Sequence, residues 1–270
     1  MRAKDWVKAQ IGVWQVFYEG RDVRDKEVHP AVMPIALAKK AVELFTHEGE
    51  LVLDPFNGIG TTLVACQDLE RNAVGFDISS KYCEIAKTRL SQAKLDGRTK
   101  QLVICDDARN IPEYLEADSI SLMFTSPPYA NLLNRPRLNK SRRGELRQNK
   151  QFLRVEQYSQ DARDLGTLTI EDYSKRMKEI YERLLPLLKP GRHNVINVPD
   201  MWWRSGSYGK RIPIHVYIIQ SLIEAGYELR NTIIWDRTNI VNRIGIFGWP
   251  SNYITMGTTF EYLLDFWRPP

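Results

Sequence analysis

The sequence predicts an α/β fold in which a mostly parallel central sheet is flanked by helices. Short apolar runs, each long enough for one strand, alternate along the chain with longer segments whose apolar residues recur at helical spacing. This alternation is typical of parallel sheets, because each strand returns to the same edge through a crossover helix. The 270 residues are 43% hydrophobic and 26% charged, so the chain has enough apolar side chains for a large core.

The first half of the chain contains four expected strands and three expected helices. A helix is expected in residues 29–45, because Ile35, Ala38 and Val42 recur at helical spacing. Pro34 suits the first turn of that helix. The strands are expected at 51–54, 72–77, 101–107 and 119–126, and the other helices at 62–70 and 79–94.

The second half opens with a long charged insertion at about 130–168 and then resumes the alternation. A structureless connection of this length within a domain is usually functional or disordered. At the other end of the chain, residues 1–28 are expected to form a short helix or an irregular arm. Beyond the insertion we expect helices at 169–191 and 212–229, strands at 193–200, 230–236 and 260–269, and aromatic-rich loops at 201–211 and 242–253.

The net charge of +5 is concentrated in one segment of the insertion. Residues 135–154 carry a net +7, so the rest of the chain sums to −2. A local basic segment fits a polyanionic partner, and on charge alone it fits a solvated loop equally well. Its basic residues are Arg135, Arg137, Lys140, Arg142, Arg143, Arg147, Lys150 and Arg154.

Hydropathy and cysteine usage bear on the compartment of the protein. No apolar run approaches membrane-spanning length, and the N-terminus lacks the apolar core of a signal peptide. The three cysteines lie too far apart for a paired-cysteine metal site, and an odd count fits free thiols. We therefore expect a cytoplasmic protein without a metal centre or a membrane partner.

Polar side chains follow each of the four expected strands of the first half. Because ligands bind beyond the carboxyl ends of parallel strands, these side chains are expected to share one site. Gly58 and Gly60, after Asp54, let the backbone approach a ligand closely. Asp77 stands where an acidic residue typically binds ribose hydroxyls. Aspartates also cap helices at such turns, but four successive strand ends weaken that explanation. The other strand ends carry Asp106, Asp107 and Ser126.

The loop after the first of these strands excludes two common phosphate sites. The stretch "DPFNGIGTT" has neither the GxGxxG spacing of dinucleotide-binding proteins nor the GK[ST] ending of a phosphate loop. An aspartate at the strand end also disfavours a pyrophosphate. The implied ligand has a ribose, a base and a positively charged part, and S-adenosyl-L-methionine meets this description.

Five motifs occur in the order "HPAVMP", "LDPFNGIGTT", "GFDIS", "CDDAR" and "FTSPPY". Together they resemble the DNA amino-methyltransferases, which modify N4 of cytosine or N6 of adenine. The resemblance covers nearly the whole chain. It implies a Rossmann-like methyltransferase fold, S-adenosyl-L-methionine as cofactor and double-stranded DNA as partner. It also implies a single methyltransferase domain, 1–270, with a cofactor-binding half at 29–125 and a catalytic half at 126–270. The implied cofactor-binding residues are His29, Pro30, Asp54, Pro55, Phe56, Asn57, Gly58, Gly60, Thr61, Thr62, Asp77, Ile78, Asp107 and Ala108.

The motif Ser126-Pro127-Pro128-Tyr129 is the expected catalytic corner. Its two prolines donate no backbone hydrogen bonds, so the chain must leave the strand there. An exocyclic amine is a poor nucleophile, because its lone pair is delocalised into the ring. The Ser126 hydroxyl and the Pro127 carbonyl are expected to accept its N–H bonds and to aim the lone pair at the methyl group. Tyr129 is expected to stack on the base after the base has left the duplex.

The first residue of the corner bears on which base is modified. In the resembling family this residue tends to be Ser in N4-cytosine enzymes and Asp or Asn in N6-adenine enzymes. A hydroxyl both donates and accepts, so it can also serve the ring N3 of cytosine. We therefore predict methylation of cytosine N4 in DNA. The alternatives are adenine N6 on the same scaffold, then an RNA base methyltransferase or a non-catalytic DNA-binding protein.

Target recognition is expected in the basic insertion, which directly follows Tyr129. Its side chains would neutralise phosphates, and some would read guanine edges. In the two aromatic-rich loops, Trp202, Trp203 and Trp249 either flank the flipped base or pack on the core. A cognate restriction endonuclease is a further expected partner. The expected DNA-binding residues are Arg135, Arg137, Lys140, Arg142, Arg143 and Arg147.

Overall fold

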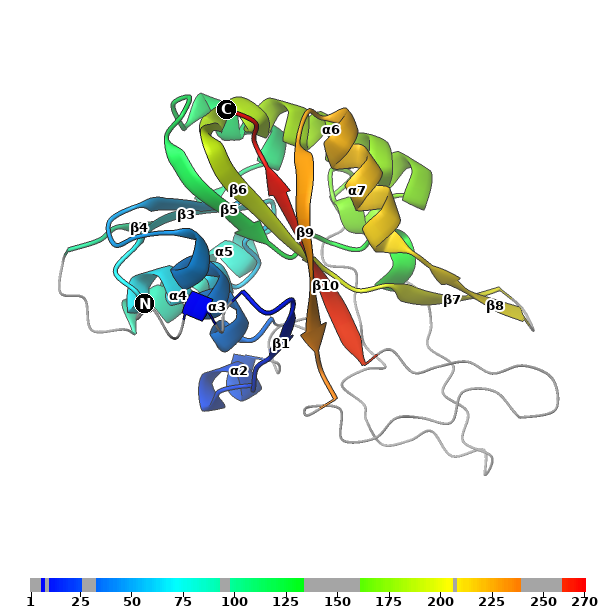
Figure 1. Cartoon of the computed structure of the whole chain (residues 1–270), viewed down its shortest axis with the longest axis horizontal. Coiled ribbons are helices and arrows are strands. Elements are labelled where there is room, and N and C mark those ends of the chain that lie inside the picture. Colours follow the sequence, from blue (N-terminus) through cyan, green and yellow to red (C-terminus); the bar gives the residue numbers. More distant parts are fainter. Residues whose placement is uncertain are drawn as a thin grey trace.

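A computed structural model shows a central eight-stranded sheet with helices on both of its faces (Figure 1). It describes residues 6–7, 10–25, 33–92, 98–133, 161–205, 208–238 and 259–270. Neighbouring strands are parallel except at β10 (Phe260–Trp267), which runs antiparallel to both of its neighbours. The predicted α/β fold class is therefore confirmed. The strand order is β1 (Val13–Gln15), β9 (Glu228–Asp236), β10, β6 (Leu188–Val198), β5 (Ile120–Thr125), β2 (Leu51–Asp54), β3 (Asn72–Asp77) and β4 (Gln101–Cys105).

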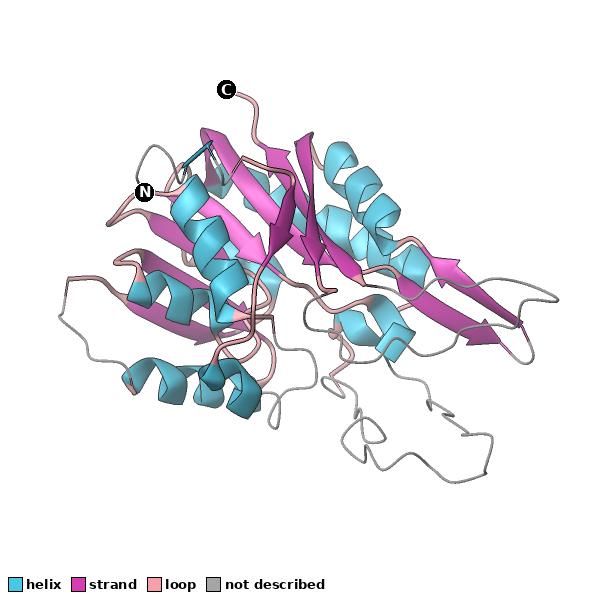
Figure 2. Ribbon diagram, turned by 60° about the horizontal axis from the view of Figure 1, so that its bottom comes forward, coloured by secondary structure: helices cyan, strands magenta, loops and turns pink. Residues whose placement is uncertain are grey.

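Two layers of helices cover the sheet, as the two views in Figures 1 and 2 show. The helices α3 (Ile35–Phe45), α4 (Thr61–Asp68) and α5 (Ser80–Ser91) contribute to one apolar cluster. The helices α6 (Ile170–Leu184) and α7 (Ile214–Glu224) contribute to the other. Successive side chains of a strand point to opposite faces, so Val195 of β6 joins the first cluster and Ile196 joins the second. No helix in the described ranges is both long enough and apolar enough to cross a membrane.

The helix expected at 169–191 ends earlier than predicted. The helix α6 stops at Leu184, a 3-10 turn η5 (Leu185–Leu187) follows, and β6 begins at Leu188 rather than at residue 193. Pro186 gives the physical reason, because it lacks the N–H through which the α-helix would continue, and the chain passes into the 3-10 turn instead. The prediction of helix over 185–191 was therefore wrong.

The N-terminal arm adds an edge strand that the sequence pattern did not reveal. The strand β1 pairs in parallel with β9, and Trp14 at its centre is only 1% exposed. After it, Asp22 of the short helix α2 (Gly20–Asp25) accepts backbone hydrogen bonds from Glu19 (2.6 Å) and Ile35 (3.0 Å). The arm is thereby fastened to the first turn of α3. A three-residue strand is too short to show the alternation by which strands are recognised.

The aromatic-rich stretch at 201–211 is a hairpin rather than the expected loop. The strands β7 (Met201–Ser205) and β8 (Tyr208–Ile212) pair in antiparallel register from Met201 opposite Ile212 to Ser205 opposite Tyr208. Tryptophan, tyrosine and isoleucine favour strands, which accounts for the pairing of a stretch that was expected to be a loop. The second aromatic-rich loop, 242–253, with Trp249, lies outside the described residues.

Candidate active site

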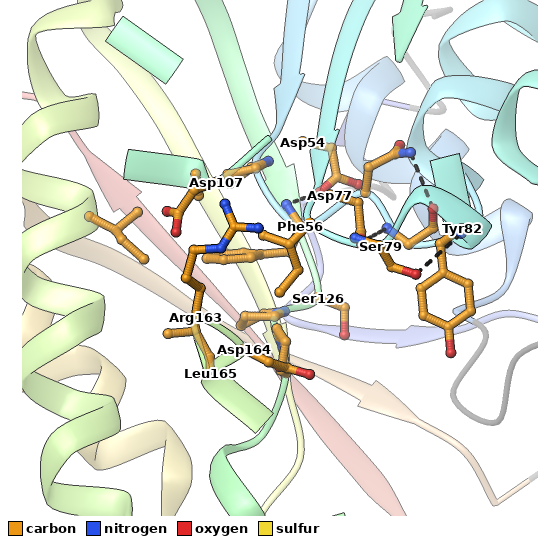
Figure 3. Close-up of a pocket in the computed structure, with 18 of the residues that line it drawn as sticks. Asp54, Phe56, Asp77, Ser79, Tyr82, Asp107, Ser126, Arg163, Asp164 and Leu165 are labelled. Atoms are coloured by element: carbon orange, nitrogen blue, oxygen red, sulfur yellow. Dashed lines mark hydrogen bonds between the residues drawn. The ribbon is translucent and has the colours of Figure 1, made fainter. Parts of the chain in front are cut away.

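A pocket opens at the carboxyl ends of β2, β3, β4 and β5 (Figure 3). The loops that follow these four strands form most of its wall, and residues of α6 complete it. The structure thus brings together the strand ends that the sequence singled out. The sequence-predicted residues in the wall are Asp54, Pro55, Phe56, Asn57, Gly58, Thr61, Thr62, Asp77, Ile78, Asp107, Ala108, Ser126, Pro127, Pro128 and Tyr129.

The loop between β2 and α4 is shaped by glycines and anchored by a buried carboxylate. Gly58 and Gly60 both have left-handed backbone, with φ of 51° and 81°. Gly60 lies behind the wall, where a Cβ would come within 2.9 Å of Ala86 Cβ. Asp54 Oδ1 accepts hydrogen bonds from Thr125 Oγ1 (2.6 Å) and from the Phe56 N–H (3.1 Å). Burial raises the pKa of Asp54 to about 6.

Asp77, at the end of β3, joins two loops of the pocket. Its Oδ2 accepts the backbone N–H of Gly58 and its Oδ1 that of Ser79, both at 2.8 Å. Burial raises the pKa of Asp77 to about 6, although these two hydrogen bonds oppose the rise. Each oxygen of the Asp77 carboxylate has a second lone pair. The carboxylate that holds the two loops in place can therefore also accept hydrogen bonds from ribose hydroxyls.

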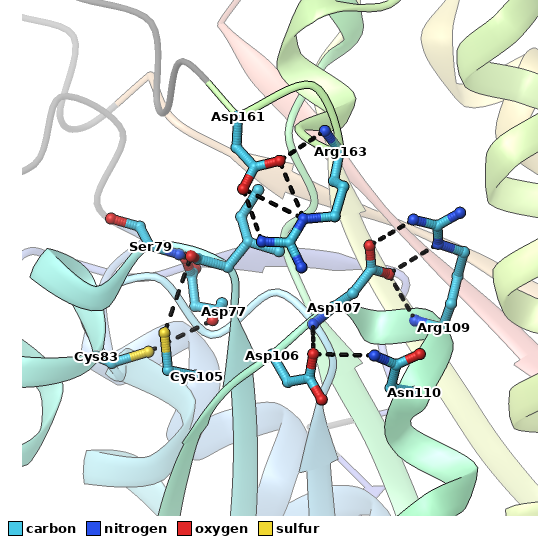
Figure 4. A network of polar contacts seen from close by, with 11 residues as sticks. Asp77, Ser79, Cys83, Cys105, Asp106, Asp107, Arg109, Asn110, Asp161 and Arg163 are labelled. Atoms are coloured by element: carbon cyan, nitrogen blue, oxygen red, sulfur yellow. Dashed lines mark hydrogen bonds and ion pairs between the residues drawn. The ribbon is translucent and has the colours of Figure 1, made fainter.

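The end of β4 carries a pair of aspartates with different partners (Figure 4). Asp107, 6% exposed, caps the 3-10 helix η1 (Ala108–Glu113) and forms an ion pair with Arg109 at 2.7 Å. Asp106 accepts hydrogen bonds from Asn110 Nδ2 (3.0 Å) and Tyr114 Oη (2.8 Å). Burial favours a higher pKa at Asp107, but the hydrogen bonds from Arg109 outweigh it and hold the pKa below its usual range. This side of the pocket therefore stays ionised.

The catalytic corner follows β5 directly. Ser126 Oγ lies 2.7 Å from Tyr129 Oη, so the two hydroxyls share a hydrogen bond. Tyr129 lines the pocket and also belongs to the core, and it is 8% exposed. Ala130, the next residue, has φ of 51°, an uncommon value for a residue with a Cβ. Strained backbone of this kind persists where the surrounding structure enforces it, and here it turns the chain away from the corner.

The C-terminal end of the expected insertion belongs to the pocket, which the sequence did not indicate. Arg163, Asp164 and Leu165 line the wall, although the insertion was expected to extend to about residue 168 as a DNA-binding segment. Residues 161–168 pack beside the corner, and the DNA-binding role of the insertion stays a prediction. Asp106, which the sequence singled out as a strand-end residue, also lines the wall. The other wall residues that sequence reasoning missed are Met33, Ile59, Ser79, Tyr82, Arg109, Arg176 and Ile180.

Two groups of predicted residues lie outside the described residues. His29 and Pro30 precede the described start of the α3 region, so their expected place beside the cofactor stays a prediction. The expected DNA-binding side chains fall within 134–160, which the structure does not describe. They are Arg135, Arg137, Lys140, Arg142, Arg143 and Arg147.

Comparison with known families identifies the family to which the chain belongs. Residues 3–88 and 120–268 match the N6/N4 DNA methylase family, and the matched ranges contain the glycine loop, Asp77 and the catalytic corner. The chain belongs to this DNA methylase family. The resemblance drawn from the motifs is therefore confirmed, and so is S-adenosyl-L-methionine as the cofactor. A family that spans N6 and N4 enzymes does not separate adenine from cytosine as the target.

Individual relatives match over shorter segments. The type II methyltransferase M.HpaI of Haemophilus parainfluenzae is 37% identical over 78 residues, which are 29% of this chain and 25% of the relative. M.SmaI of Serratia marcescens is 45% identical over 62 residues, 23% of this chain and 21% of the relative. The orphan methyltransferase M.BamHII of Bacillus amyloliquefaciens is 42% identical over 62 residues, 23% of each chain. This chain thus covers only about a quarter of the length of the curated relatives it matches.

Solved structures support the fold. TrmN from Thermus thermophilus superposes with a TM-score of 0.51 at 14% identity, over 92% of this chain and 53% of TrmN. The methyltransferase crystallised with the Haloferax volcanii activator Trm112 gives a TM-score of 0.52 at 15% identity, over 93% of both chains. At these identities the likeness extends to the methyltransferase fold and not to the substrate.

The charges of the pocket fit a cofactor with a cationic centre. Among the described wall residues, carboxyl groups outnumber guanidinium groups by five to three. The expected roles of Asp77 at the ribose, of the Gly58 region in close backbone approach and of Asp107 at the adenine amino group stay predictions. The carboxyl groups belong to Asp54, Asp77, Asp106, Asp107 and Asp164, and the guanidinium groups to Arg109, Arg163 and Arg176.

Proposed function

We propose that this protein transfers a methyl group from S-adenosyl-L-methionine to the exocyclic N4 amine of cytosine in DNA. The observation that carries the proposal is the position of Ser126, whose corner forms one wall of the pocket lined by the cofactor loops. Membership of the DNA methylase family supports DNA as the substrate. The serine at the first position of the corner supports cytosine over adenine.

The chain positions the reacting amine rather than activating it covalently. Bound S-adenosyl-L-methionine would supply the electrophilic methyl group. Ser126 Oγ and the carbonyl oxygen of Pro127 accept the two N–H hydrogens of the amine, which leaves the nitrogen lone pair directed away from the corner and into the pocket. Tyr129 Oη, at 2.7 Å, holds the Ser126 hydroxyl in place, and the pocket side of the Tyr129 ring is the surface on which the base packs.

The target base must leave the duplex to reach this corner, because its paired amine is shielded inside the helix. We propose that double-stranded DNA is held by the basic segment 135–154, whose net +7 begins five residues after Ala130. Electrostatic contacts with phosphates release counterions, so binding through this segment weakens with salt.

Changing Arg135, Arg137, Arg142 and Arg143 together to Ala tests the DNA-binding segment. We expect DNA affinity at low salt to fall at least tenfold. The plot of log affinity against log salt should also become less steep, by the amount that corresponds to the loss of about three to four phosphate contacts. A matched control removes four exposed charges elsewhere, at Lys81, Lys87, Arg98 and Lys175. Equal losses in both variants would show a general charge effect and would remove the role of the segment.

The identity of the product tests the reaction. Duplex DNA of mixed sequence is incubated with the protein and isotopically labelled S-adenosyl-L-methionine, digested to nucleosides and analysed by mass spectrometry. We expect labelled N4-methylcytosine. Labelled N6-methyladenine would replace the proposed target by the alternative, and label found only with RNA would contradict DNA as substrate. If the protein binds the cofactor but methylates no nucleic acid, the result would favour the alternative of a non-catalytic DNA-binding protein.

A cognate restriction endonuclease stays a prediction from the resemblance. The similar relatives include both type II methyltransferases and an orphan methyltransferase. Digestion of host-strain DNA with and without the methyltransferase gene distinguishes a paired from a solitary enzyme.

A further inference from the structure

Residues 161–168, here called the returning segment, bring three side chains into the cofactor pocket from beyond the catalytic corner. The segment contains the 3-10 turn η4 (Leu165–Thr167), which packs against the turn η2 (Ala130–Leu133) that leaves the corner. The Asn131 N–H donates to the Leu168 carbonyl at 2.9 Å. The returning segment and the corner therefore form one connected wall.

The returning segment has its own internal bonds, which fix its shape. The Arg163 guanidinium forms a two-pronged ion pair with Asp161, with Nη2–Oδ2 at 2.7 Å and Nε–Oδ1 at 3.0 Å. Asp164 Oδ1 accepts the Gly166 N–H at 2.7 Å, and its carbonyl accepts the Thr167 N–H at 3.0 Å. Asp164 is therefore held in one orientation as the cap of η4.

Asp164 is an acidic side chain placed deep in the pocket wall. It is only 3% exposed and shares the pocket with Asp77 and Ser126. Figure 3 shows it beside the Ser126 corner and across the cavity from Asp77. Burial is the main cause of the raised pKa of Asp77; the charge of Asp54 adds to it, and that of Asp164 adds a smaller contribution. Two carboxylates facing one cavity favour a cation between them.

The proposed reaction determines which part of the cofactor lies between these groups. The ribose is expected at Asp77, and the amine of the target base at Ser126. The sulfonium is bonded to the ribose carbon on one side and carries the transferred methyl on the other. The positive sulfur is therefore expected between Asp77 and Ser126, in the part of the cavity whose wall includes Asp164.

We propose that Asp164 of the returning segment binds the sulfonium side of S-adenosyl-L-methionine and makes the pocket selective for the charged cofactor over the neutral product, S-adenosylhomocysteine. This inference rests on the proposed methyl transfer. A carboxylate in a partly desolvated site attracts a nearby cation and has no such attraction for a neutral thioether. Because transfer removes the positive charge, loss of this attraction assists product release.

Calorimetric titrations of the full chain, without DNA, test the assignment with three probes. These are S-adenosyl-L-methionine, S-adenosylhomocysteine, and sinefungin, which carries an ammonium where the methyl sulfonium stands. In Asp164→Asn the side-chain oxygen still caps η4, so the segment retains its shape. We expect affinity for the two cations to fall about tenfold, from the loss of one nearby charge, and affinity for the neutral product to change less than twofold.

Asp161→Asn is the matched control, because it removes a carboxylate from the same segment but outside the pocket wall. We expect it to change the affinities for all three probes by similar factors. Equal losses for cations and neutral product in Asp164→Asn, or no loss at all, would overturn the sulfonium assignment. Thermal unfolding of both variants shows whether either one is misfolded. In that case Asp164→Glu, which retains the charge, serves as the second variant, and we expect it to keep the preference for the charged cofactor over the neutral product. Binding of the cofactor without any methyl transfer by the wild type would instead contradict the proposed function.

Discussion

The two sides of the cofactor pocket hold their aspartates by different means. At the ends of β2 and β3, Asp54 is buried and Asp77 is half-buried, and both accept hydrogen bonds only from neutral backbone and hydroxyl groups among the bonds found in the structure. Burial raises the pKa of both to about 6. At the end of β4, Asp107 is also buried but is paired with Arg109, and its pKa is held below the usual range.

The two sides of the pocket thus differ in whether a cationic side chain already neutralises the carboxylate. Neutral donors fix the position of Asp54 and Asp77 without neutralising their charges, so these carboxylates would attract a cation. The Arg109 guanidinium already compensates Asp107, which leaves that carboxylate as a hydrogen-bond acceptor of fixed position. The β2–β3 side is therefore suited to a cationic ligand, and the β4 side to a neutral polar group.

Substitutions on the two sides are expected to differ in size. Asp77→Ala removes the acceptors of the Gly58 and Ser79 N–H groups as well as a charge, and we expect affinity for S-adenosyl-L-methionine to fall about a hundredfold. Asp107→Asn retains the cap of η1 and loses only the charge, so a loss of about tenfold is expected. Calorimetric titration measures both, and equal losses would show that the two sides do not differ as described.

The rigid packing behind the β2–β3 side is tested by Gly75→Ala. A Cβ at Gly75 of β3 would lie 2.4 Å from the Oδ1 atom of Asn57, whose backbone N–H is bound to the Phe76 carbonyl. We expect a loss of about 2 kcal/mol in the free energy of unfolding and a lower melting temperature. Gly12→Ala is the control, because nothing lies within 4 Å of its added Cβ. Similar melting temperatures for both variants would contradict tight packing at Asn57.

Cofactor affinity is expected to depend on pH through the β2–β3 side. As pH falls through about 6, Asp54 and Asp77 become protonated in the free protein, and we expect affinity for S-adenosyl-L-methionine to weaken several-fold between pH 7.5 and 5.5.

The folding stability changes in the opposite sense. Burial raises both pKa values above those of the unfolded chain, so the stabilising contribution of the protonated forms is present at low pH and is lost as pH rises through about 6. Asp77→Asn should flatten both pH profiles in part. If the affinity for S-adenosyl-L-methionine is the same at pH 7.5 and at pH 5.5, neither carboxylate interacts with the bound cation.

The sequence predicted the strands and the site residues best where an apolar run is directly followed by a polar residue. The β2, β3 and β5 strands lie within one residue of their predicted bounds, because each is a short, mainly apolar run followed by a turn signal. The strand-end aspartates could be found for the same reason, since a polar residue directly after a buried strand is placed by the topology of a parallel sheet.

Features that depend on distant contacts could not be found in this way. The strand β1 exists only because β9 offers it a free edge, and its three residues carry no periodic signal of their own. Asp164 is brought to the pocket by the packing of η4 on η2, across an intervening segment with no motif to mark its return. Its one local signal is the spacing to Gly166, which is typical of a capping aspartate but also occurs in ordinary turns.

Ser126→Ala tests the central claim most directly, with DNA methylation and cofactor binding measured on the same preparation. Within the described part of the chain the hydroxyl bonds to Tyr129 Oη and to no residue of the glycine loop, so we expect the affinity for S-adenosyl-L-methionine to stay within about twofold of wild type. Formation of N4-methylcytosine should fall at least a hundredfold, because the amine loses the acceptor that aims its lone pair. Wild-type turnover in this variant would contradict the proposed role of Ser126 and, with it, the catalytic corner.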